Sequence, residues 1–594
     1  MGQDQTVGLR AIRTVIRPRK IHVLLKRYGL ALACLGAAIG LWWPGVSAAQ
    51  GQGQNGPAAL FGFVVDEQRH PIANVEVNVF YDGLPEPVAV ASSHRDGLWE
   101  INLPRYPEKS ARLSFDHTHF RARSVSLDEE QMLRLRRGGS VSMGETVMSN
   151  RYAAGFWVAG ATFLLVLILM AAETMPSATV ALLGVAIIFA STFFGGRIFP
   201  SLYVFDFERA LTYINWEVIF LVMGMMIVVG AIESTGLFQW LAFQSYRWSR
   251  GQPVVLVIIL VMITALASAF LDNVTTMLLM VPISLEIAVA LGLPPQSLLI
   301  PEIFASNIGG IMTLIGTPTN ILIGAQAGIS FNDFLLNQMA GGVLALGVMV
   351  ACVLWFFRRD YAKAEQGISP SLYARLARNA AIKDVLVLRK SLLVFVVTIV
   401  LFALGEPLHM VPAVTALLAA TVILVWVETD VEMMINLVDW TTLVFFMALF
   451  MVVGAIQEVG LIGAMAGIMG QVIGSNLYIG VFVVVLGGGL LSFVVASIPL
   501  TAAMLPVVEF ISGRIPGAAT SKILYYGLSM GMGLGGNGLL IGGETNLMTA
   551  GVADRAGYRV TFASFARVGI PTTLLSLLAG SLWLLLRFKV LGGG

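Results

Sequence analysis

Two polar clusters interrupt long apolar runs in the middle of the chain. They are Leu271-Asp272-Asn273-Val274-Thr275-Thr276 and Gly316-Thr317-Pro318-Thr319-Asn320. Matching clusters recur 224 to 226 residues later, at Ser497-Ile498-Pro499-Leu500-Thr501 and Gly542-Gly543-Glu544-Thr545-Asn546. Polar groups without partners are costly in an apolar surrounding, and such residues usually mark a functional site. Four interruptions in two matching halves are typical of a site for membrane transport.

Glycine and proline make these clusters suitable for breaking a helix. Gly309-Gly310 with Gly316, and Gly535-Gly536 with Gly542, allow the backbone to unwind and approach a ligand. Pro318 prevents continuous helical hydrogen bonding. The N-termini of the resulting half-helices attract anions, and the freed carbonyl groups attract cations.

Neutral oxygen atoms and one carboxylate supply candidate ligands. Hydroxyl and amide oxygens suit Na⁺, and we expect two candidate Na⁺ sites. Their ligands are Asn273, Thr317 and Asn320 in the first half, and Ser497, Thr545 and Asn546 in the second. The full set of predicted ion- or substrate-binding residues is Asp272, Asn273, Thr275, Thr276, Asn307, Gly309, Gly310, Gly316, Thr317, Thr319, Asn320, Ser497, Thr501, Gly535, Gly536, Asn537, Gly542, Glu544, Thr545 and Asn546.

Asp272 is the most informative of these residues, because a carboxylate at a hairpin tip can exchange a proton or hold a cation. Its counterpart in the second half is Ala496, so the carboxylate is not duplicated. Glu544 occupies the position that matches Pro318. Its side chain either provides a second titratable group or caps the half-helix N-terminus.

Composition places the chain among polytopic helical membrane proteins. It is 57% hydrophobic and only 12% charged over 594 residues, whereas soluble proteins carry about 25% charged residues. Many apolar runs are long enough to cross a bilayer. The net charge of +2 gives no indication of nucleic-acid binding, and the two cysteines, Cys34 and Cys352, lie in separate apolar runs and do not indicate a disulfide framework.

The N-terminal part predicts an exported β domain. Residues 1–27 are basic and should stay in the cytoplasm, so the apolar segment 28–48 acts as a signal anchor or as a removed signal peptide. Residues 57–148 alternate apolar and polar positions, as at Val75, Val77 and Val79, which predicts a small antiparallel β-sandwich. His117-Thr118-His119 could hold a metal, but without an evident third ligand a surface or turn role is the stronger expectation.

The remainder of the chain divides into two transporter repeats, 152–357 and 391–590, joined by a basic and therefore cytoplasmic linker, 358–390. Two apolar arms, 253–270 and 274–291, predict a re-entrant hairpin with Asp272 at its tip. Seven positions are identical at an offset of 224 residues, among them Trp216 and Trp440. An odd number of crossings separates equivalent helices, so the repeats should be inverted. The expected fold is all-α, with about eleven membrane helices, two re-entrant hairpins and the β-sandwich.

The same segments resemble a known family. The runs Leu271-Asp272-Asn273-Val274-Thr275-Thr276-Met277-Leu278-Leu279, Ser306-Asn307-Ile308-Gly309-Gly310 and Gly535-Gly536-Asn537-Gly538-Leu539-Leu540-Ile541-Gly542 are similar to the P protein branch of the ion transporter superfamily. That superfamily also holds arsenite permeases, sodium/proton antiporters and citrate or dicarboxylate transporters. The resemblance implies a citrate transporter-like domain with a scaffold part, a mobile part, elevator-like alternating access and a homodimer. Residues 57–148 resemble carboxypeptidase regulatory-like or transthyretin-like domains.

Three residues depart from the family pattern. Ser497 stands where the second hairpin tip commonly carries Asn, Thr317 resembles the dicarboxylate branch, and Glu544 is unusual among relatives. These differences leave the substrate and the coupling ion open.

We therefore expect a secondary active transporter, not an enzyme, for a small ion coupled to H⁺ or Na⁺. The expected location is a bacterial inner membrane with the β domain in the periplasm. A passive anion channel is the alternative. A membrane receptor that senses through the β domain is a weaker one, since the chain has no recognisable output domain.

Overall fold

The computed structural model describes residues 59–589, except for 67–70, 73, 83–85, 95, 105–109, 137–138, 150, 173–174, 365–369, 406, 428–430 and 463–475. The predicted cytoplasmic N-terminus, 1–27, and the signal anchor or signal peptide, 28–48, lie outside the described residues.

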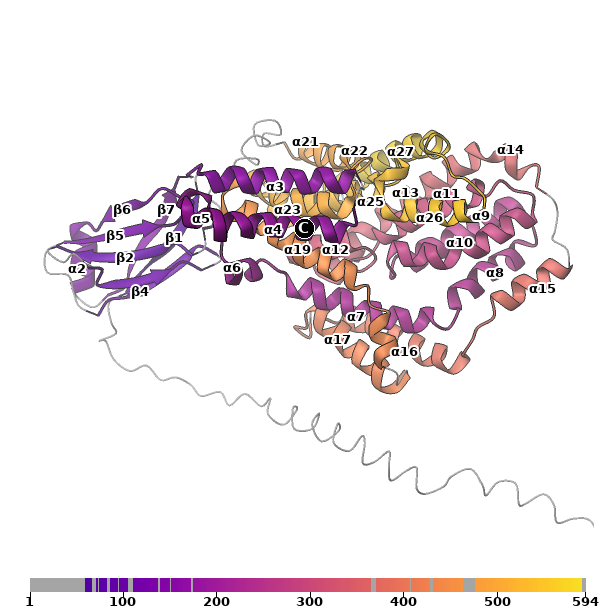
Figure 1. Cartoon of the computed structure of the whole chain (residues 1–594), viewed down its shortest axis with the longest axis horizontal. Coiled ribbons are helices and arrows are strands. Elements are labelled where there is room, and N and C mark those ends of the chain that lie inside the picture. The colour runs from indigo at the N-terminus through magenta and orange to yellow at the C-terminus, as the bar shows by residue number, and fades with distance from the viewer. Residues whose placement is uncertain are drawn as a thin grey trace, which may run out of the picture. The chain divides into compact units, whose positions relative to one another are not determined.

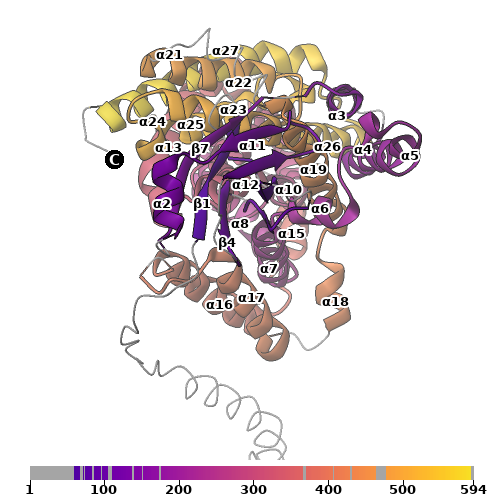
Figure 2. The same ribbon diagram turned by 90° about the vertical axis from the view of Figure 1, so that its left-hand side faces the viewer.

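Residues 59–148 form two small β-sheets. One sheet has the order β4-β1-β7 and the other β3-β2-β5-β6, and Figure 2 shows β7, β1 and β4 side by side. The elements are β1 (Ala59–Asp66), β2 (Glu76–Tyr81), β3 (Ala89–Ser92), β4 (Leu98–Asn102), β5 (Ala111–Asp116), β6 (Arg123–Ser126), α2 (Glu129–Arg136) and β7 (Val141–Met148). The purely antiparallel pairing expected from the sequence is wrong in one place, because β7 pairs with β1 in parallel. Period-two alternation fixes which face of a strand is buried but not the direction of its neighbour.

The interior of this domain comes from the alternating apolar residues. Val75, Val77 and Val79 are fully buried, as is Trp99, whose ring meets the Phe115 ring edge-to-face at 5.5 Å. Aromatic pairs of this geometry add to the stabilisation that area burial provides.

The histidines predicted at a surface or turn lie in a turn, but they are not on the surface. The ring of His119 is buried and its Nε2 lies 2.7 Å from the carbonyl oxygen of Val204. Burial lowers the pKa of His119. His117 Nε2 lies 3.4 Å from Glu458, which also pairs with Arg209 at 2.9 Å. Sequence alone could not show this, because the partners are 85 or more positions away in the chain.

The first repeat is helical from Ala154 onward. Its elements are α3 (Ala154–Ala171), α4 (Ser177–Ala190), α5 (Gly196–Ile198), α6 (Phe207–Thr212), α7 (Trp216–Glu233), α8 (Leu237–Ser249), α9 (Pro253–Ser268), α10 (Asn273–Ala290), α11 (Gln296–Gly310), α12 (Pro318–Ala327) and α13 (Phe331–Phe356). α14 (Arg358–Tyr361) and α15 (Pro370–Asn379) follow in the linker. The predicted interrupted helix near 299–325 is the pair α11 and α12.

The second repeat follows the same order. Its elements are α16 (Val385–Ala403), α17 (Pro412–Val422), α18 (Val431–Asn436), α19 (Trp440–Glu458), α21 (Leu477–Phe482), α22 (Gly488–Leu491), α23 (Ser497–Arg514), α24 (Ala518–Ser521), α25 (Ile523–Gly535), α26 (Glu544–Arg555) and α27 (Phe562–Lys589). A π-helical segment, Val483–Gly487, joins α21 to α22. In Figure 1, α25 and α26 of this repeat lie among α10, α11 and α13 of the first.

Equivalent residues make equivalent contacts in the two repeats. Asn215 caps α7 by accepting a hydrogen bond from the Val218 amide, and Asp439 caps α19 in the same way through the Thr441 amide. A Cβ at Gly230 of α7 would meet Leu437, while a Cβ at Gly454 of α19 would meet Tyr213. Leu437 and Tyr213 are themselves related by the offset of 224, so each repeat packs reciprocally against the other, as a two-fold axis requires.

The helices have the length and surface of membrane helices. Within the described residues, eight are long and apolar enough to cross a membrane, and four shorter apolar helices accompany them. Many large apolar side chains face outward, including Trp157, Leu164, Leu336 and Leu582. An outward apolar surface of this extent is suited to lipid.

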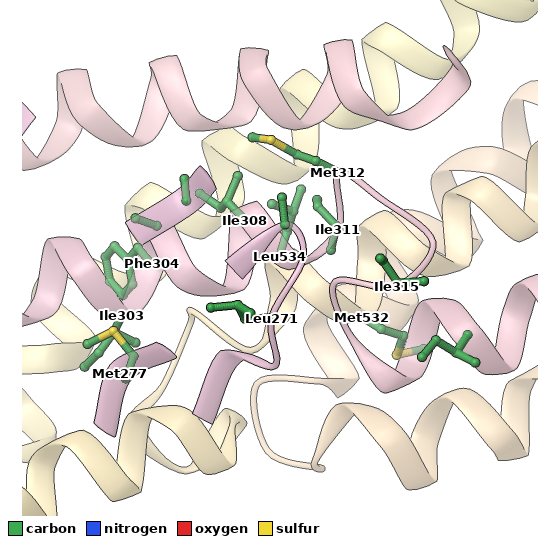
Figure 3. Packing of buried hydrophobic residues seen from close by; sticks show 14 of the residues in the cluster. Leu271, Met277, Ile303, Phe304, Ile308, Ile311, Met312, Ile315, Met532 and Leu534 are labelled. Atoms are coloured by element: carbon green, nitrogen blue, oxygen red, sulfur yellow. The ribbon is translucent and has the colours of Figure 1, made fainter. Parts of the chain in front are cut away.

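Apolar packing surrounds the first hairpin tip and the helix break beside it. Figure 3 shows Met277 of α10 near Ile303 and Phe304 of α11, with Met532 and Leu534 of α25 in the same view. Because residues of both repeats contribute to this core, the break is held by side chains far apart in the sequence.

Candidate functional site

The first hairpin tip is fastened by its own polar residues. Asp272 caps α10, with Oδ2 accepting from the amides of Val274 at 3.0 Å and Thr275 at 3.3 Å. Asn273 Oδ1 accepts from Ser268 Oγ at 2.5 Å, and its Nδ2 donates to Asn307 Oδ1 at 3.2 Å. The tip is therefore joined to α11 by side-chain hydrogen bonds and does not lie in open water.

Two asparagines close the helix breaks in the same manner. Asn320 Nδ2 donates to the carbonyl oxygens of Gly310 (3.0 Å) and Thr313 (2.8 Å). Asn546 Nδ2 donates to those of Gly536 (2.7 Å) and Leu539 (3.1 Å). The acceptors are carbonyls left without helical partners where α11 and α25 end. Both asparagines are fully buried, so the amides replace backbone hydrogen bonds that water could not supply.

Glycines let the hairpins approach the breaks. A Cβ at Gly309 would lie 2.2 Å from the Ala265 carbonyl oxygen, and one at Gly535 would lie 2.3 Å from that of Gly489. At Gly316 a Cβ would meet the carbonyl oxygen of Gly310 at 2.6 Å, and at Gly542 that of Gly536 at 2.9 Å. Only glycine permits these approaches of backbone to backbone.

Hydrogen bonds cross between the repeats at the breaks. Asn307 Nδ2 donates to Asn537 Oδ1 at 2.8 Å and to Asn546 Oδ1 at 3.2 Å. Ser529 Oγ donates to Asn320 Oδ1 at 2.7 Å. The amide oxygens of Asn320 and Asn546 are thereby engaged by protein, so their part in this structure is to hold the site together.

A small cavity of about 50 Å³ lies where both tips and both breaks meet. It is lined by Asp272, Asn273, Val274, Asn307, Thr317, Pro318, Thr319, Ala496, Ser497, Ile498, Met532, Gly533, Gly536, Gly542, Gly543, Glu544 and Thr545. A cavity of this volume admits a few waters or a small ion.

The predicted site residues divide into two sets around this cavity. Ten line it: Asp272, Asn273, Asn307, Thr317, Thr319, Ser497, Gly536, Gly542, Glu544 and Thr545. The other ten do not: Thr275, Thr276, Gly309, Gly310, Gly316, Asn320, Thr501, Gly535, Asn537 and Asn546. Most of the second set builds the walls, through the backbone approaches of the glycines and the hydrogen bonds of the asparagines. Thr501 Oγ1 bonds within its own helix, to the Ser497 carbonyl oxygen.

The candidate Na⁺ ligands divide in the same way. Asn273, Thr317, Ser497 and Thr545 line the cavity, whereas Asn320 and Asn546 do not. The donor set is oxygen only, and no cluster of three His, Cys, Asp or Glu suited to a metal ion occurs among the described residues. Hydroxyl and amide oxygens fit an alkali cation better than a transition metal.

Opposite electrostatic features meet at the cavity. α12 begins at Pro318 and α26 at Glu544, so the N-termini of two half-helices, ten and twelve residues long, open onto it. Helix N-termini favour negative charge. Two carboxylates, Asp272 and Glu544, lie on the same lining and favour a cation. The arrangement can hold an anion and a cation side by side.

Several serines and threonines of the site were not predicted. Ser268 and Ser306 bridge the tip to α11, with their Oγ atoms 3.1 Å apart. Thr313 Oγ1 donates to the Ala269 carbonyl oxygen, and Ser529 supports Asn320. Their closeness to the Gly and Asn motifs was the available signal, but serine and threonine are common in membrane helices as packing residues.

The chain matches known transporters over most of its length. The citrate transporter family model (CitMHS) matches residues 165–526. A protein of Mycobacterium tuberculosis named as an uncharacterized transporter is 34% identical over 435 residues, which covers 73% of this chain and 99% of that protein. The human P protein is 30% identical over 459 residues, covering 65% of this chain and 55% of the P protein.

One solved structure is also similar. The YdaH transporter of Alcanivorax borkumensis aligns with a TM-score of 0.48 and 14% identity over 74% of this chain and 99% of its own. The family match and the sequence relatives decide the assignment: this chain is an integral membrane transport protein of the citrate transporter family.

Proposed function

We propose that this protein is a secondary active transporter that moves a small ion across the membrane, coupled to H⁺ or Na⁺, by elevator-like alternating access. The observation that carries the proposal is the cavity shared by both hairpin tips and both helix breaks. Equivalent elements of the two repeats contribute to it, and inverted repeats around a central site are the general architecture of alternating access.

The chemistry of the lining favours an anionic substrate accompanied by a cation. Two half-helix N-termini offer backbone N–H groups, which attract carboxylate or inorganic anions. Asp272 and Glu544 would repel an anion that arrived alone, so a cation or a proton must neutralise them when it binds. Coupling follows from this requirement, because neither partner binds well without the other.

The elevator step is supported by the way the site elements are joined. Asn307 links α11 to α25 and α26 side chains, and Ser529 links α25 to α12. These cross-repeat bonds make the tips and breaks one unit that could shift against the remaining helices without losing its site.

Localisation and assembly are proposed on weaker physical grounds. The excess of basic residues in 1–27 and 358–390 favours a cytoplasmic position for both segments. The β domain would then lie in the periplasm of a bacterial inner membrane. A homodimer is what the family resemblance implies.

Flux in proteoliposomes tests the proposal. The purified protein should accumulate citrate or another small ion from a defined panel against its gradient, and only with an inward Na⁺ or H⁺ gradient. Empty liposomes and an Asp272→Asn preparation serve as controls. Movement that always follows the gradient of the panel ion alone, with no dependence on Na⁺ or pH, would establish the passive channel instead.

A further inference from the structure

One carboxyl group of α11 takes no part in the cavity. The side chain of Glu302 is 1% exposed, and its Oε1 accepts a hydrogen bond of 2.7 Å from Ser284 Oγ on α10. Ser284 is fully buried too. The other carboxyl oxygen, Oε2, is buried and has no hydrogen-bond partner.

No positive charge compensates this group. Glu302 forms no ion pair with any described residue. The helices packed against α11 are α9, α10, α13, α25 and α26. Their charged groups are Asp272 at the start of α10 with Glu286 further along it, Asp333 on α13, and Glu544, Asp554 and Arg555 on α26. α25 adds the phenols Tyr525 and Tyr526, and α9 adds none. An ionised carboxylate with one hydrogen bond in such a place costs several kcal/mol, which a bound proton removes.

Glu302 is connected to the first hairpin tip. Ser306 lies four residues further along α11, about 6 Å away at 1.5 Å per residue. Ser306 Oγ donates to the Asn273 carbonyl oxygen at 3.2 Å and lies 3.1 Å from Ser268 Oγ. A change of charge at Glu302 would therefore act within one helical turn of the residues that fasten the tip.

The second repeat shows that packing does not require this pair. The offset of 224 that relates Pro282 to Pro506 places Val508 opposite Ser284. The offset of 226 that relates Gly310 to Gly536 places Leu528 opposite Glu302. Val508 and Leu528 are both fully buried. The same fold is thus built with two apolar residues, and replacing buried polar pairs by apolar ones is often neutral or stabilising.

We propose that Glu302, with Ser284, is a proton-binding site of the transporter, separate from the cavity. This inference deepens the proposed function and rests on it, with H⁺ as a coupling ion. Glu302 takes up a proton from water when the carrier is open to one side and releases it to water on the other, with no other bond made or broken. The proton travels with the mobile unit because α11 carries both Glu302 and Asn307.

Two variants separate the proposal from a structural role. Glu302→Gln keeps the size and stays neutral. The double variant Ser284→Val/Glu302→Leu installs the apolar pair of the second repeat. Glu509→Gln, an exposed carboxylate on α23 bonded to Gln326, is the matched control. Folding is checked by thermal unfolding in detergent, where all three should match the unmodified protein.

The first readout is independent of the substrate. At neutral pH the infrared spectrum of the unmodified protein and of Glu509→Gln should contain a protonated carboxyl band that Glu302→Gln lacks. A spectrum in which Glu302→Gln keeps that band in full overturns the proposal.

The second readout is proton movement in proteoliposomes with a trapped pH dye, after a jump of Na⁺ and, separately, of citrate. Both Glu302 variants should reduce proton movement to the level of protein-free liposomes, while Glu509→Gln should not. Unchanged proton movement in Glu302→Gln refutes the proton site and leaves the proposed transport intact. Absence of any flux in the unmodified protein counts against the proposed function, and the infrared arm then decides the proton site alone.

Discussion

The two repeats share their architecture but not their chemistry. Asn320 and Asn546 close the two breaks with the same pair of backbone acceptors, and Gly309 and Gly535 admit the hairpins to nearly the same distance. The carboxylates are distributed unevenly: Asp272 faces the alanine of the second tip, and Glu544 faces a proline.

The comparison teaches that closing a helix break and binding an ion are separable tasks. Every buried backbone group at a break must be satisfied, so the closing residues are needed twice. A charge in the site is costly and is placed only where binding needs it. The duplicated residues should therefore affect stability, and the unduplicated ones should affect transport.

The largest effect should come from the duplicated glycines. Gly309→Ala and Gly535→Ala each place a Cβ within 2.2 and 2.3 Å of a backbone oxygen. Helix and hairpin must then separate, which costs at least as much as ordinary overpacking, roughly 1–3 kcal/mol. We expect a strong loss of folded protein in membranes for both variants, measured by fluorescence-detected size exclusion. Gly347→Ala in α13 is the control, since its Cβ would meet no atom within 4 Å. Equal yields for all three would contradict the close approach.

Asp272→Asn tests the unduplicated chemistry. Asparagine is as good an N-cap as aspartate, so α10 should remain capped and the fold intact. Loss of the carboxylate should abolish coupled flux in proteoliposomes while the unfolding temperature stays within a few degrees. The control Asp439→Asn changes the cap of α19, away from the cavity lining, and should retain flux. Full coupled transport by Asp272→Asn would remove Asp272 from the site.

The closing asparagines should show a smaller and symmetric effect. Asn320→Ala and Asn546→Ala each leave two buried carbonyls without a donor, for which about 1–3 kcal/mol of stability is expected. Thermal unfolding in detergent should show similar shifts for both variants. Gln326→Ala removes only an exposed contact with Glu509 and should have almost no effect. A large difference between the two asparagine variants would break the equivalence of the repeats.

The smallest effect concerns the β domain, which contacts the end of α19 through Glu458, whereas α7 has Ser234 at that position. Burial lowers the pKa of His119. The unfolded state therefore binds more protons just below the ordinary value of about 6.5, so this contribution is full above that pH and is lost as pH falls.

Resistance of the β domain to limited proteolysis should accordingly decrease on acidification from neutral pH. His119→Gln should remove most of that pH dependence, and the exposed control His94→Gln should preserve it. Resistance that is unchanged or rises in acid would mean that His119 binds its proton in the folded state.

Much of the site was predictable because its parts are local in sequence. The Gly309-Gly310 and Gly535-Gly536 pairs, the tip at Asp272 and the breaks before Asn320 and Asn546 all lie where the sequence predicted them. The cavity that ten predicted residues line is consistent with the proposed site, whose ion-binding role remains to be tested.

The misses share one physical cause. Whether an asparagine faces a ligand or a backbone carbonyl depends on partners ten to 239 residues away, as with Asn546 and its bonds to Gly536 and Asn307. The parallel pairing of β7 with β1 and the burial of His117 and His119 have the same origin.

The sequence by itself determined the membrane class, the repeat and the positions of the four interruptions, because hydrophobicity and glycine or proline act through local backbone preferences. Only the tertiary structure decided which side chains line the cavity, which ones brace it, and that Glu302 lies without a counter-charge. Those outcomes depend on the relative placement of helices from both repeats, and an unsatisfied or satisfied polar group is defined only by what the fold brings within about 3 Å of it.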